Sequence, residues 1–223
     1  MPPPIRVALL GCGRWGHRLL GALEQHPAME VVCVADRLAP ALSVARAIAP
    51  RARRVTSLER ALSCDVAAVI VATPPAWHDR HVLEVLAAGR DVLVEKPLAT
   101  SAAAAHRLSQ IARAQGSVAM VGHLLRFHPA IERVVARAAG NAPLSVRTRR
   151  LTSSQRPELL WTLGPHDLST LIALDDSDVV DIQVRHHHGL NISLALASGT
   201  RAALELSTGA RPERTLRVAW RDT

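Results

Sequence analysis

The segment IRVALLGCGRWG, residues 5–16, decides the fold. It begins with a short apolar run typical of a buried strand, and Gly11, Gly13 and Gly16 follow in a G-x-G-x-x-G pattern. In this pattern the first glycine permits a tight turn, the second lets a pyrophosphate approach the backbone, and the third permits close packing of a helix. We therefore predict a strand, a phosphate-binding turn and a helix that begins near Trp15.

An acidic residue lies where such a motif needs one. Asp36 ends the next predicted strand, VVCVAD, 20 residues after Gly16, and its carboxylate can hold the ribose hydroxyls of a dinucleotide. A carboxylate repels a 2′-phosphate, which favours NAD, but the neighbouring Arg37 can accommodate that phosphate, so NADP stays open. The alternative is an α/β protein in which the glycine turn and the aspartate serve the fold alone.

The first part of the chain alternates apolar, β-rich runs with helical ones, as βαβ units do. Strands are predicted at 5–10, 31–36, 66–73, 91–96 and 117–122. Helices are predicted to begin near Trp15, Ala39, Trp77 and Ser101, the last of which is a good N-cap. We therefore expect residues 1–122 to form a dinucleotide-binding Rossmann domain with a doubly wound parallel sheet, in an α/β fold.

The pattern changes after residue 122. Helices are expected at 129–140 and from about 166 to 174, and strands at 144–151, 179–184, 191–198, 201–207 and 215–220. Short turns join several of these strands, as in antiparallel hairpins. Residues 123–223 are therefore predicted to form an α+β domain with an open, mainly antiparallel sheet, which would carry the substrate wall and the oligomer surface.

Composition limits the classes of protein that the chain can be. The longest apolar run, residues 66–72, is too short to cross a membrane, and 48% hydrophobic composition over 223 residues is enough for genuine cores. Cys12, Cys33 and Cys64 show no CxxC spacing, so neither a zinc site nor a disulfide framework is expected. Reduced thiols fit a cytoplasmic protein best.

The net charge of +8 raises the question of nucleic acid. The basic clusters at 51–54 and 147–150 lack interleaved aromatic residues, so an anionic small ligand is favoured and no nucleic-acid partner is expected. His186, His187 and His188 suggest a metal, but neighbouring strand residues point to opposite faces, which favours a solvated turn and no metal site.

Lys96 is the single lysine among 27 basic residues. Arginine stays protonated in proteins, whereas a desolvated lysine can lose its proton, so a site that keeps lysine can be one where a proton moves. Lys96 follows a predicted strand in the motif EKP, and Pro97 disfavours helical geometry there and admits a cis peptide bond. The alternative is a solvated lysine at a strand end.

The segment ATPPAWH, residues 72–78, follows the most hydrophobic predicted strand. Its position is the carboxyl end of that strand, where open α/β sheets bind ligands. The plainer interpretation is a proline loop that precedes a helix and leaves His78 exposed on the first turn.

Taken in order, the motifs GCGRWG, Asp36, ATPP with His78, EKPLA, VGH followed by RFHP, and LGPHDLS resemble the Gfo/Idh/MocA family of nicotinamide-dependent sugar oxidoreductases. They most resemble members that act on nucleotide-linked amino sugars. The resemblance implies hydride transfer between a nicotinamide and a hydroxyl or ketone carbon of a sugar or nucleotide sugar. It implies that Lys96 and His166 form the catalytic pair, since the lysine amine and the histidine imidazole can both be tuned to move a proton near neutral pH.

The same resemblance implies the other site residues. Those expected at the cofactor are Gly11, Gly13, Arg14, Trp15, Gly16, Asp36, Arg37, Thr73, Pro74, His78, Glu95 and Lys96. Those expected at the sugar are His123, Arg126, Trp161 and Thr162, and Arg126 can hold a phosphate or carboxylate through two hydrogen bonds.

Two departures from the family pattern stand out. Many relatives carry aspartate four residues before the catalytic histidine, where this chain has Thr162, so the proton relay is expected to be weakened, rerouted through Asp167 or lost. Relatives also usually continue past the point where this chain stops, and an open sheet edge favours a homodimer or higher homo-oligomer formed through the C-terminal sheet, or else a compromised fold. Two alternatives follow: a non-catalytic NAD-binding sensor or assembly protein, and an enzyme that recycles bound NAD within an elimination or hydrolysis.

Overall fold

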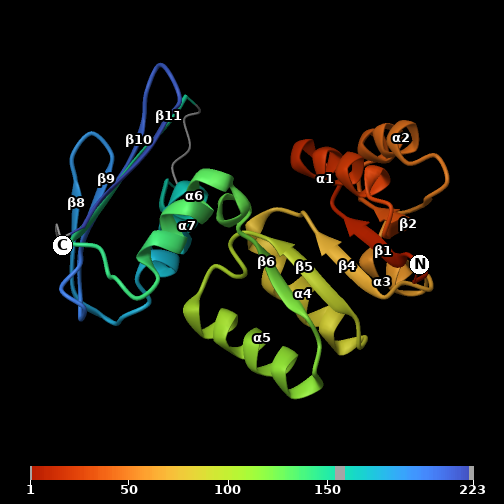
Figure 1. Ribbon diagram of the computed structural model, residues 1–223. Helices are drawn as coiled ribbons and strands as arrows, with labels where there is room; N and C mark the ends of the chain where they lie inside the picture. Colours follow the sequence, from red (N-terminus) through yellow and green to blue (C-terminus); the bar gives the residue numbers. More distant parts are fainter. Residues whose placement is uncertain (1, 154–158, 221–223) are drawn as a thin grey trace. The chain divides into compact units, whose positions relative to one another are not determined.

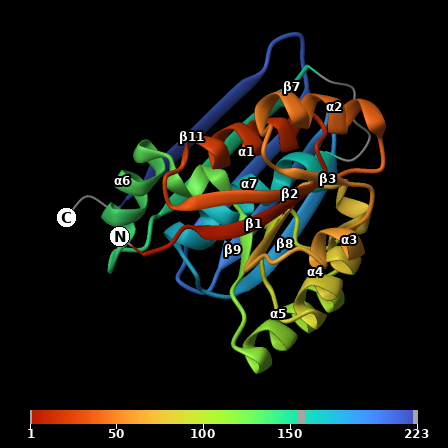
Figure 2. The same ribbon diagram turned by 90° about the vertical axis from the view of Figure 1, so that its right-hand side faces the viewer.

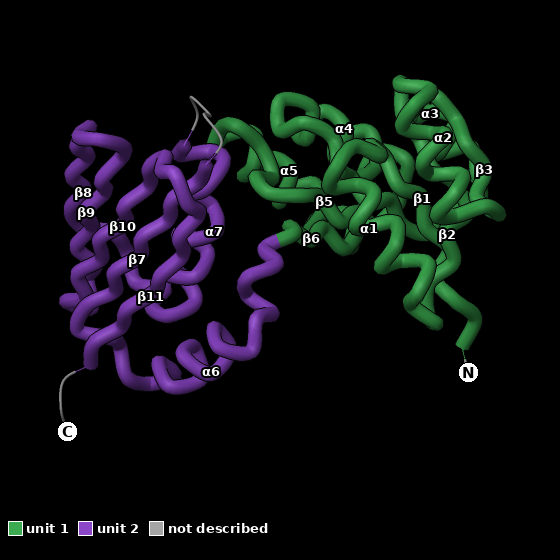
Figure 3. Tube along the Cα trace, turned by 90° about the horizontal axis from the view of Figure 1, so that it is seen from above, with its two compact units in different colours: residues 1–122 green, residues 123–223 purple. Residues whose placement is uncertain are grey.

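The structure is a computed structural model that describes residues 2–153 and 159–220, drawn as a ribbon in Figure 1. The chain divides after Gly122 into two compact units, coloured separately in Figure 3. Each unit has its own sheet and its own apolar core. Within the described residues, no helix has both the length and the apolar character that a membrane crossing requires.

The first unit is built on six parallel strands in the order β3-β2-β1-β4-β5-β6. This is the doubly wound order, in which the chain reverses direction across the sheet between β1 and β4. The strands are β1 (Ile5–Leu10), β2 (Met29–Ala35), β3 (Arg53–Val55), β4 (Ala68–Val71), β5 (Asp91–Glu95) and β6 (Ala119–Gly122). The helices are α1 (Arg14–Gln25), α2 (Ala39–Ile48), α3 (Leu58–Leu62), η1 (Pro75–Trp77), α4 (His78–Ala87) and α5 (Ala102–Gln115).

Both faces of this sheet are apolar because helices cover both. Val7 and Leu9 of β1 pack in the cluster that includes Leu20 of α1, whereas Ala8 and Leu10 pack in the cluster of α3, α4 and α5. Figure 2 shows α1 and α2 on one side of the strands and α3, α4 and α5 on the other. The near-continuous apolar composition of the predicted strands is thus explained by burial on two sides.

The predicted α/β fold class is confirmed, and the differences lie at element ends. Ser101 caps α5 through a 3.2 Å hydrogen bond from the amide of Ala104, and Gly116 ends that helix with φ of 68°. β4 is four residues long, shorter than the predicted 66–73. Two short elements, β3 and α3, were not predicted, because three and five residues carry too little periodicity to recognise.

The second unit has a five-stranded sheet in the order β11-β7-β10-β9-β8. Only β7 and β10 pair in parallel, so the predicted mainly antiparallel sheet is confirmed. The strands are β7 (Ser145–Thr152), β8 (Val179–His186), β9 (Leu190–Leu196), β10 (Arg201–Thr208) and β11 (Glu213–Ala219). The helical elements are η2 (Leu124–Phe127), α6 (Pro129–Ala138) and α7 (Leu159–Leu174).

One face of this sheet is covered by helices. Ile192 and Leu194 of β9 and Leu204 of β10 share a core with Leu171 of α7 and Ala138 of α6. Figure 1 shows α6 and α7 along that face. The edge strand β8 is different, because all of its residues are exposed.

Helix α7 differs most from expectation. It begins at Leu159, not near residue 166, and it contains Pro165. Proline ordinarily marks a helix start, since it lacks an amide proton and clashes with the preceding turn, and this rule misled the prediction. The preceding turn instead belongs to the same helix, so Trp161 and Thr162 lie one turn before Pro165 and His166.

Asp175 ties the end of α7 to the β9–β10 turn. Its carboxylate accepts hydrogen bonds from the hydroxyls of Ser177, Ser198 and Thr200. Burial acts to raise the pKa of Asp175, but these donors outweigh it and lower the pKa from 3.8 to about 2. The group is largely buried, with 8% of its surface exposed.

We predict that Asp175→Asn removes a pH-dependent part of the stability. Because the folded pKa lies below the unfolded one, the carboxylate contributes roughly 2 kcal/mol above pH 3.8, and this is lost as the pH falls toward 2. Urea unfolding of the variant should therefore show the loss at neutral pH and a flatter pH dependence in acid. The exposed neighbour substitution Asp176→Asn is the control, and equal effects of the two substitutions would contradict the assignment.

Candidate functional site

The glycine turn between β1 and α1 is closely packed at its first and third glycines. Gly11 has φ of +90°, and a Cβ there would lie 2.8 Å from the carbonyl of Ala72. A Cβ on Gly16 would collide with the carbonyl oxygen of Gly11. These two positions therefore need glycine for the fold, the first for the turn and the second for helix packing, as predicted from the motif.

Gly13 is glycine for a different reason. It is the N-cap residue of α1, its φ of −75° suits any residue, and a Cβ there would meet nothing within 4 Å. It also lines a cavity. No protein atom excludes a side chain at Gly13. The missing Cβ therefore leaves a space at the start of α1, here called the cradle, that a side chain would fill. This fits a backbone kept bare for an anion at the helix N-terminus.

Asp36 follows β2 directly and faces the same turn. Its Oδ2 accepts a 2.7 Å hydrogen bond from the amide of Cys12, and its Oδ1 accepts one of 2.9 Å from the amide of Leu38. The carboxylate is therefore oriented by backbone on both sides. Each oxygen has further lone pairs, so the group can still accept from ribose hydroxyls.

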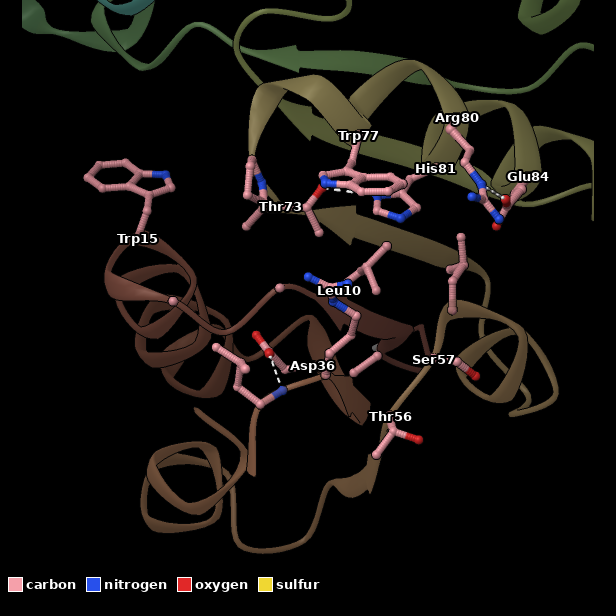
Figure 4. A pocket seen from close by; sticks show the side chains of 18 of the residues that line it. Leu10, Trp15, Asp36, Thr56, Ser57, Thr73, Trp77, Arg80, His81 and Glu84 are labelled. Atoms are coloured by element: carbon pink, nitrogen blue, oxygen red, sulfur yellow. Dashed lines mark hydrogen bonds and ion pairs between the residues drawn. The ribbon is translucent and has the colours of Figure 1, made fainter. Parts of the chain in front are cut away.

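A cavity of about 760 Å³ opens at the carboxyl ends of β1, β2, β3 and β4. Figure 4 shows Asp36 on one side of it, with Trp77 and His81 across from that carboxylate. Eight residues predicted at the cofactor line the cavity: Gly11, Gly13, Arg14, Trp15, Asp36, Arg37, Thr73 and Pro74. Sequence reasoning missed other lining residues, among them Leu38, Thr56, Ser57, Glu59, Trp77, Arg80, His81 and Glu84.

The wall opposite Asp36 is made by η1 and α4. The ring of Trp77 stacks on that of His81 at 6.1 Å between centroids, and the hydroxyl of Thr73 lies 3.0 Å from His81 Nδ1. Burial lowers the pKa of His81, opposed by Glu84 and assisted by Arg80. The Thr73 hydroxyl can donate a hydrogen bond to the neutral ring of His81, so the cavity wall is an aromatic surface with a fixed polar edge.

Four residues predicted at the cofactor do not line this cavity: Gly16, His78, Glu95 and Lys96. Glu95, the last residue of β5, accepts a 2.6 Å hydrogen bond from the indole Nε1 of Trp15. Lys96 follows it directly, is half-buried, and is joined to Pro97 by a cis peptide bond. In the sheet order, β5 lies beyond the reversal between β1 and β4, so Lys96 is two strands from the glycine turn.

The plainer interpretation of this segment, in which His78 is exposed on the first turn of the helix, is wrong. The side chain is 1% exposed, and both ring nitrogens contact backbone carbonyls: Nδ1 lies 2.6 Å from Pro97 O and Nε2 lies 2.7 Å from Thr73 O. The short η1 turn places His78 at the inner face of α4 instead of its solvent face. His78 therefore connects the loops after β4 and β5.

The substrate residues predicted from the family pattern all belong to the second unit. His123 and Arg126 lie at η2, and Nη1 of Arg126 donates to the carbonyl of Ser169 at 3.5 Å. Trp161 and Thr162 lie on α7 one turn before His166, and Trp161 is 38% exposed.

Asp167, which the sequence suggested as an alternative relay, is paired with an arginine. Its two carboxylate oxygens accept from Arg150 of β7 at 2.7 and 3.0 Å, and both side chains are buried. This paired geometry joins α7 to β7 of the sheet through two hydrogen bonds. His166 is on the same helix, so the ion pair fixes the helix that carries it.

The thiol of Cys12, within the glycine turn, is unreactive near neutral pH. Burial and then the charge of Asp36 raise the pKa of Cys12 to about 11, so the thiol stays protonated near neutral pH. Cys12, Cys33 and Cys64 are all free and buried.

Across residues 2–153 and 159–220, no group of three His, Cys, Asp or Glu is arranged to hold a metal ion. His186 ends β8, and His187 and His188 form the exposed turn after it.

Comparison with known proteins identifies the family. The profile of the GFO/IDH/MocA oxidoreductase family, with its NAD-binding Rossmann fold, matches residues 5–123. The chain belongs to this family. It is 31% identical over 225 residues to 4-carboxy-2-hydroxymuconate-6-semialdehyde dehydrogenase of a Sphingobium species, covering 91% of this chain and 71% of that protein. The resemblance seen in the motifs is thereby confirmed.

Solved structures agree with this assignment. The UDP-N-acetylglucosamine 3-dehydrogenase of Acidithiobacillus ferrooxidans superposes with a TM-score of 0.89 at 26% identity, covering 99% of this chain and 76% of that one. GenD2 from gentamicin A biosynthesis, in complex with NAD, superposes with a TM-score of 0.90 at 25% identity, covering 100% and 72%. Both units of this chain are thus found together in family members.

Substitutions at Gly13 and Gly16 should separate the effect on cofactor affinity from the effect on folding stability. Gly13→Ala should leave the free energy of unfolding within about 0.5 kcal/mol of the parent, since its Cβ meets no protein atom, yet weaken NADH binding about tenfold or more. Gly16→Ala should destabilise the protein by about 1–3 kcal/mol through its clash with the backbone of Gly11. Urea unfolding and NADH fluorescence titration measure the two effects, and unchanged NADH affinity in Gly13→Ala would contradict the cradle.

Proposed function

We propose that this protein transfers a hydride between a nicotinamide cofactor and the hydroxyl or ketone carbon of a sugar or nucleotide sugar. The observation that carries the proposal is the cavity at the carboxyl ends of β1–β4, with the bare backbone of Gly13 and the oriented carboxylate of Asp36, in a member of an NAD-binding oxidoreductase family. Relatives named as inositol 2-dehydrogenase, 30% identical, and UDP-N-acetylglucosamine 3-dehydrogenase, 29% identical, support the substrate class.

The first unit would hold the cofactor. Gly11, Gly13 and Arg14 would receive the pyrophosphate at the start of α1, and Asp36 would accept the adenosine ribose hydroxyls. The remaining candidates, Trp15, Gly16, Arg37, Thr73, Pro74, His78 and Glu95, would shape the turn and the cavity wall. NAD is favoured because Asp36 is charged and fixed, with Arg37 as the group that would tolerate NADP.

The chemistry would use Lys96 and His166. NAD supplies the hydride acceptor, and the hydroxyl proton of the substrate must leave as the hydride does, so a base within hydrogen-bond reach is required. We assign the proton transfer and the hydroxyl contact to these two side chains on the family resemblance. Thr162 has no negative charge to orient His166, so Lys96 would carry more of the proton transfer than in relatives with aspartate there.

The second unit would form the substrate wall. Its candidates are His123, Arg126, Trp161 and Thr162, which lie on η2 and α7. The exposed edge strand β8 supports an oligomer formed through the C-terminal sheet, because an open edge with exposed Val179, Val180, Ile182 and Val184 invites another chain. We also place the protein in the cytoplasm, on the strength of three free thiols.

The experiment that tests the function is a turnover screen. The purified protein is incubated with NAD or NADH and a panel of inositols, UDP-sugars and dTDP-sugars, and the nicotinamide absorbance band is followed. A change with at least one substrate is expected. NADH binding without turnover on any member, and without product by mass spectrometry, would favour the non-catalytic alternative.

Lys96→Arg tests the proton transfer directly. The substitution keeps the positive charge but removes an amine that can deprotonate, so turnover should fall by about two orders of magnitude or more while NADH binding is retained. Steady-state kinetics and NADH titration of the variant measure the two quantities. Near-normal turnover would show that Lys96 is not the group that moves the proton.

A further inference from the structure

The buried ring of His78 makes contacts that a neutral imidazole cannot satisfy. Its Nδ1 lies 2.6 Å from Pro97 O, and its Nε2 lies 2.7 Å from Thr73 O. Both partners are backbone carbonyls, which only accept hydrogen bonds. A neutral imidazole carries one N–H, so its other nitrogen would turn a lone pair toward a carbonyl oxygen at hydrogen-bond distance. Both contacts are favourable only when both nitrogens carry a proton.

The two carbonyls belong to the two loops that the proposed chemistry uses. Thr73 follows β4 and lines the cavity, and its hydroxyl is also held by His81. Pro97 is the residue after Lys96, which follows β5. β4 and β5 are neighbours in the sheet, so His78 spans the carboxyl ends of adjacent strands. A short bond to each carbonyl fixes how far apart the two loops lie.

We propose that His78 is doubly protonated in the folded protein and acts as a positioning residue that sets Lys96 against the cofactor-binding loop at Thr73. The lengths of the two bonds suit a charged donor, since charge-assisted hydrogen bonds are the shorter ones. The ring is 1% exposed, and burial opposes a positive charge, so the two short bonds must outweigh that cost; the same burial keeps water from competing for either carbonyl. This inference rests on the proposed function only in its last step, the role of Lys96.

The protonation state is measured first, on the unmodified protein. Two-bond ¹H–¹⁵N correlation spectra of ¹⁵N-labelled protein, with His78 assigned through its backbone, report each ring nitrogen separately. At neutral pH both nitrogens of His78 should resonate as protonated, and the exposed ring of His106 on α5 provides the reference signal. An unprotonated nitrogen in His78 at neutral pH would overturn the proposal, whether or not the protein turns over a sugar.

The positioning role is measured through Lys96. Because Lys96 is the only lysine, reductive ¹³C-methylation labels two groups, its Nζ and the α-amino group, and Lys96→Arg identifies which signal is which. His78→Gln can bond only one of the two carbonyls at a time through its amide N–H₂, so the Lys96 methyl signal and its titration should shift. The control His106→Gln should leave both unchanged. An unmoved Lys96 signal in folded His78→Gln would overturn the positioning role.

Kinetics complete the test once a substrate is found. His78→Gln should lower kcat by about 10- to 100-fold through misplacement of the amine, with a smaller change in KM. His106→Gln should match the parent. If His78→Gln does not fold, the spectra of the unmodified protein still decide the protonation state. Absence of turnover in the parent would count against the proposed function, while a doubly protonated His78 would stand.

Discussion

The contact between Gly16 and the carbonyl of Gly11 is the constraint on which the site depends. Because both glycines lack a Cβ, α1 can start directly after the turn that follows β1, and the first residues of the helix line the cavity. The amide of Cys12 within this turn then binds Asp36, which links the turn to the end of β2. A bare Gly13, an oriented carboxylate and a helix N-terminus are thus assembled by backbone packing, before any ligand contributes.

Main-chain contacts also position the loops on the other side of the sheet reversal. β4 and β5 end next to each other, and their loops carry Thr73 and Lys96. Neither loop is long, and each is bonded to His78 through a main-chain carbonyl, so the relative placement of the two does not depend on flexible side chains. Rigid backbone of this kind is what proton transfer at a defined distance requires.

Sequence alone predicted the parallel sheet, the glycine turn and the position of Asp36 at the end of β2. The hydrophobic periodicity, the glycine spacing and the place of a residue at a strand end are all local signals. It did not predict β3 or α3, which are too short to show a period, or the start of α7, where Pro165 lies inside the helix against the usual rule. It did not predict that His78 is buried between the loops after β4 and β5, because η1, the three-residue turn before it, has no signature of its own. The pairing of Asp167 with Arg150 is likewise a contact between distant segments.

The central claim is that one dinucleotide extends from the glycine turn across the sheet reversal to Lys96. A crystal structure of the protein grown with NAD tests it most directly. The account predicts the pyrophosphate against the amide of Gly13, the adenosine ribose on Asp36, and the nicotinamide ring beside Nζ of Lys96. A dinucleotide bound outside the cavity at the ends of β1–β4, or a nicotinamide beyond the reach of Lys96, would contradict it.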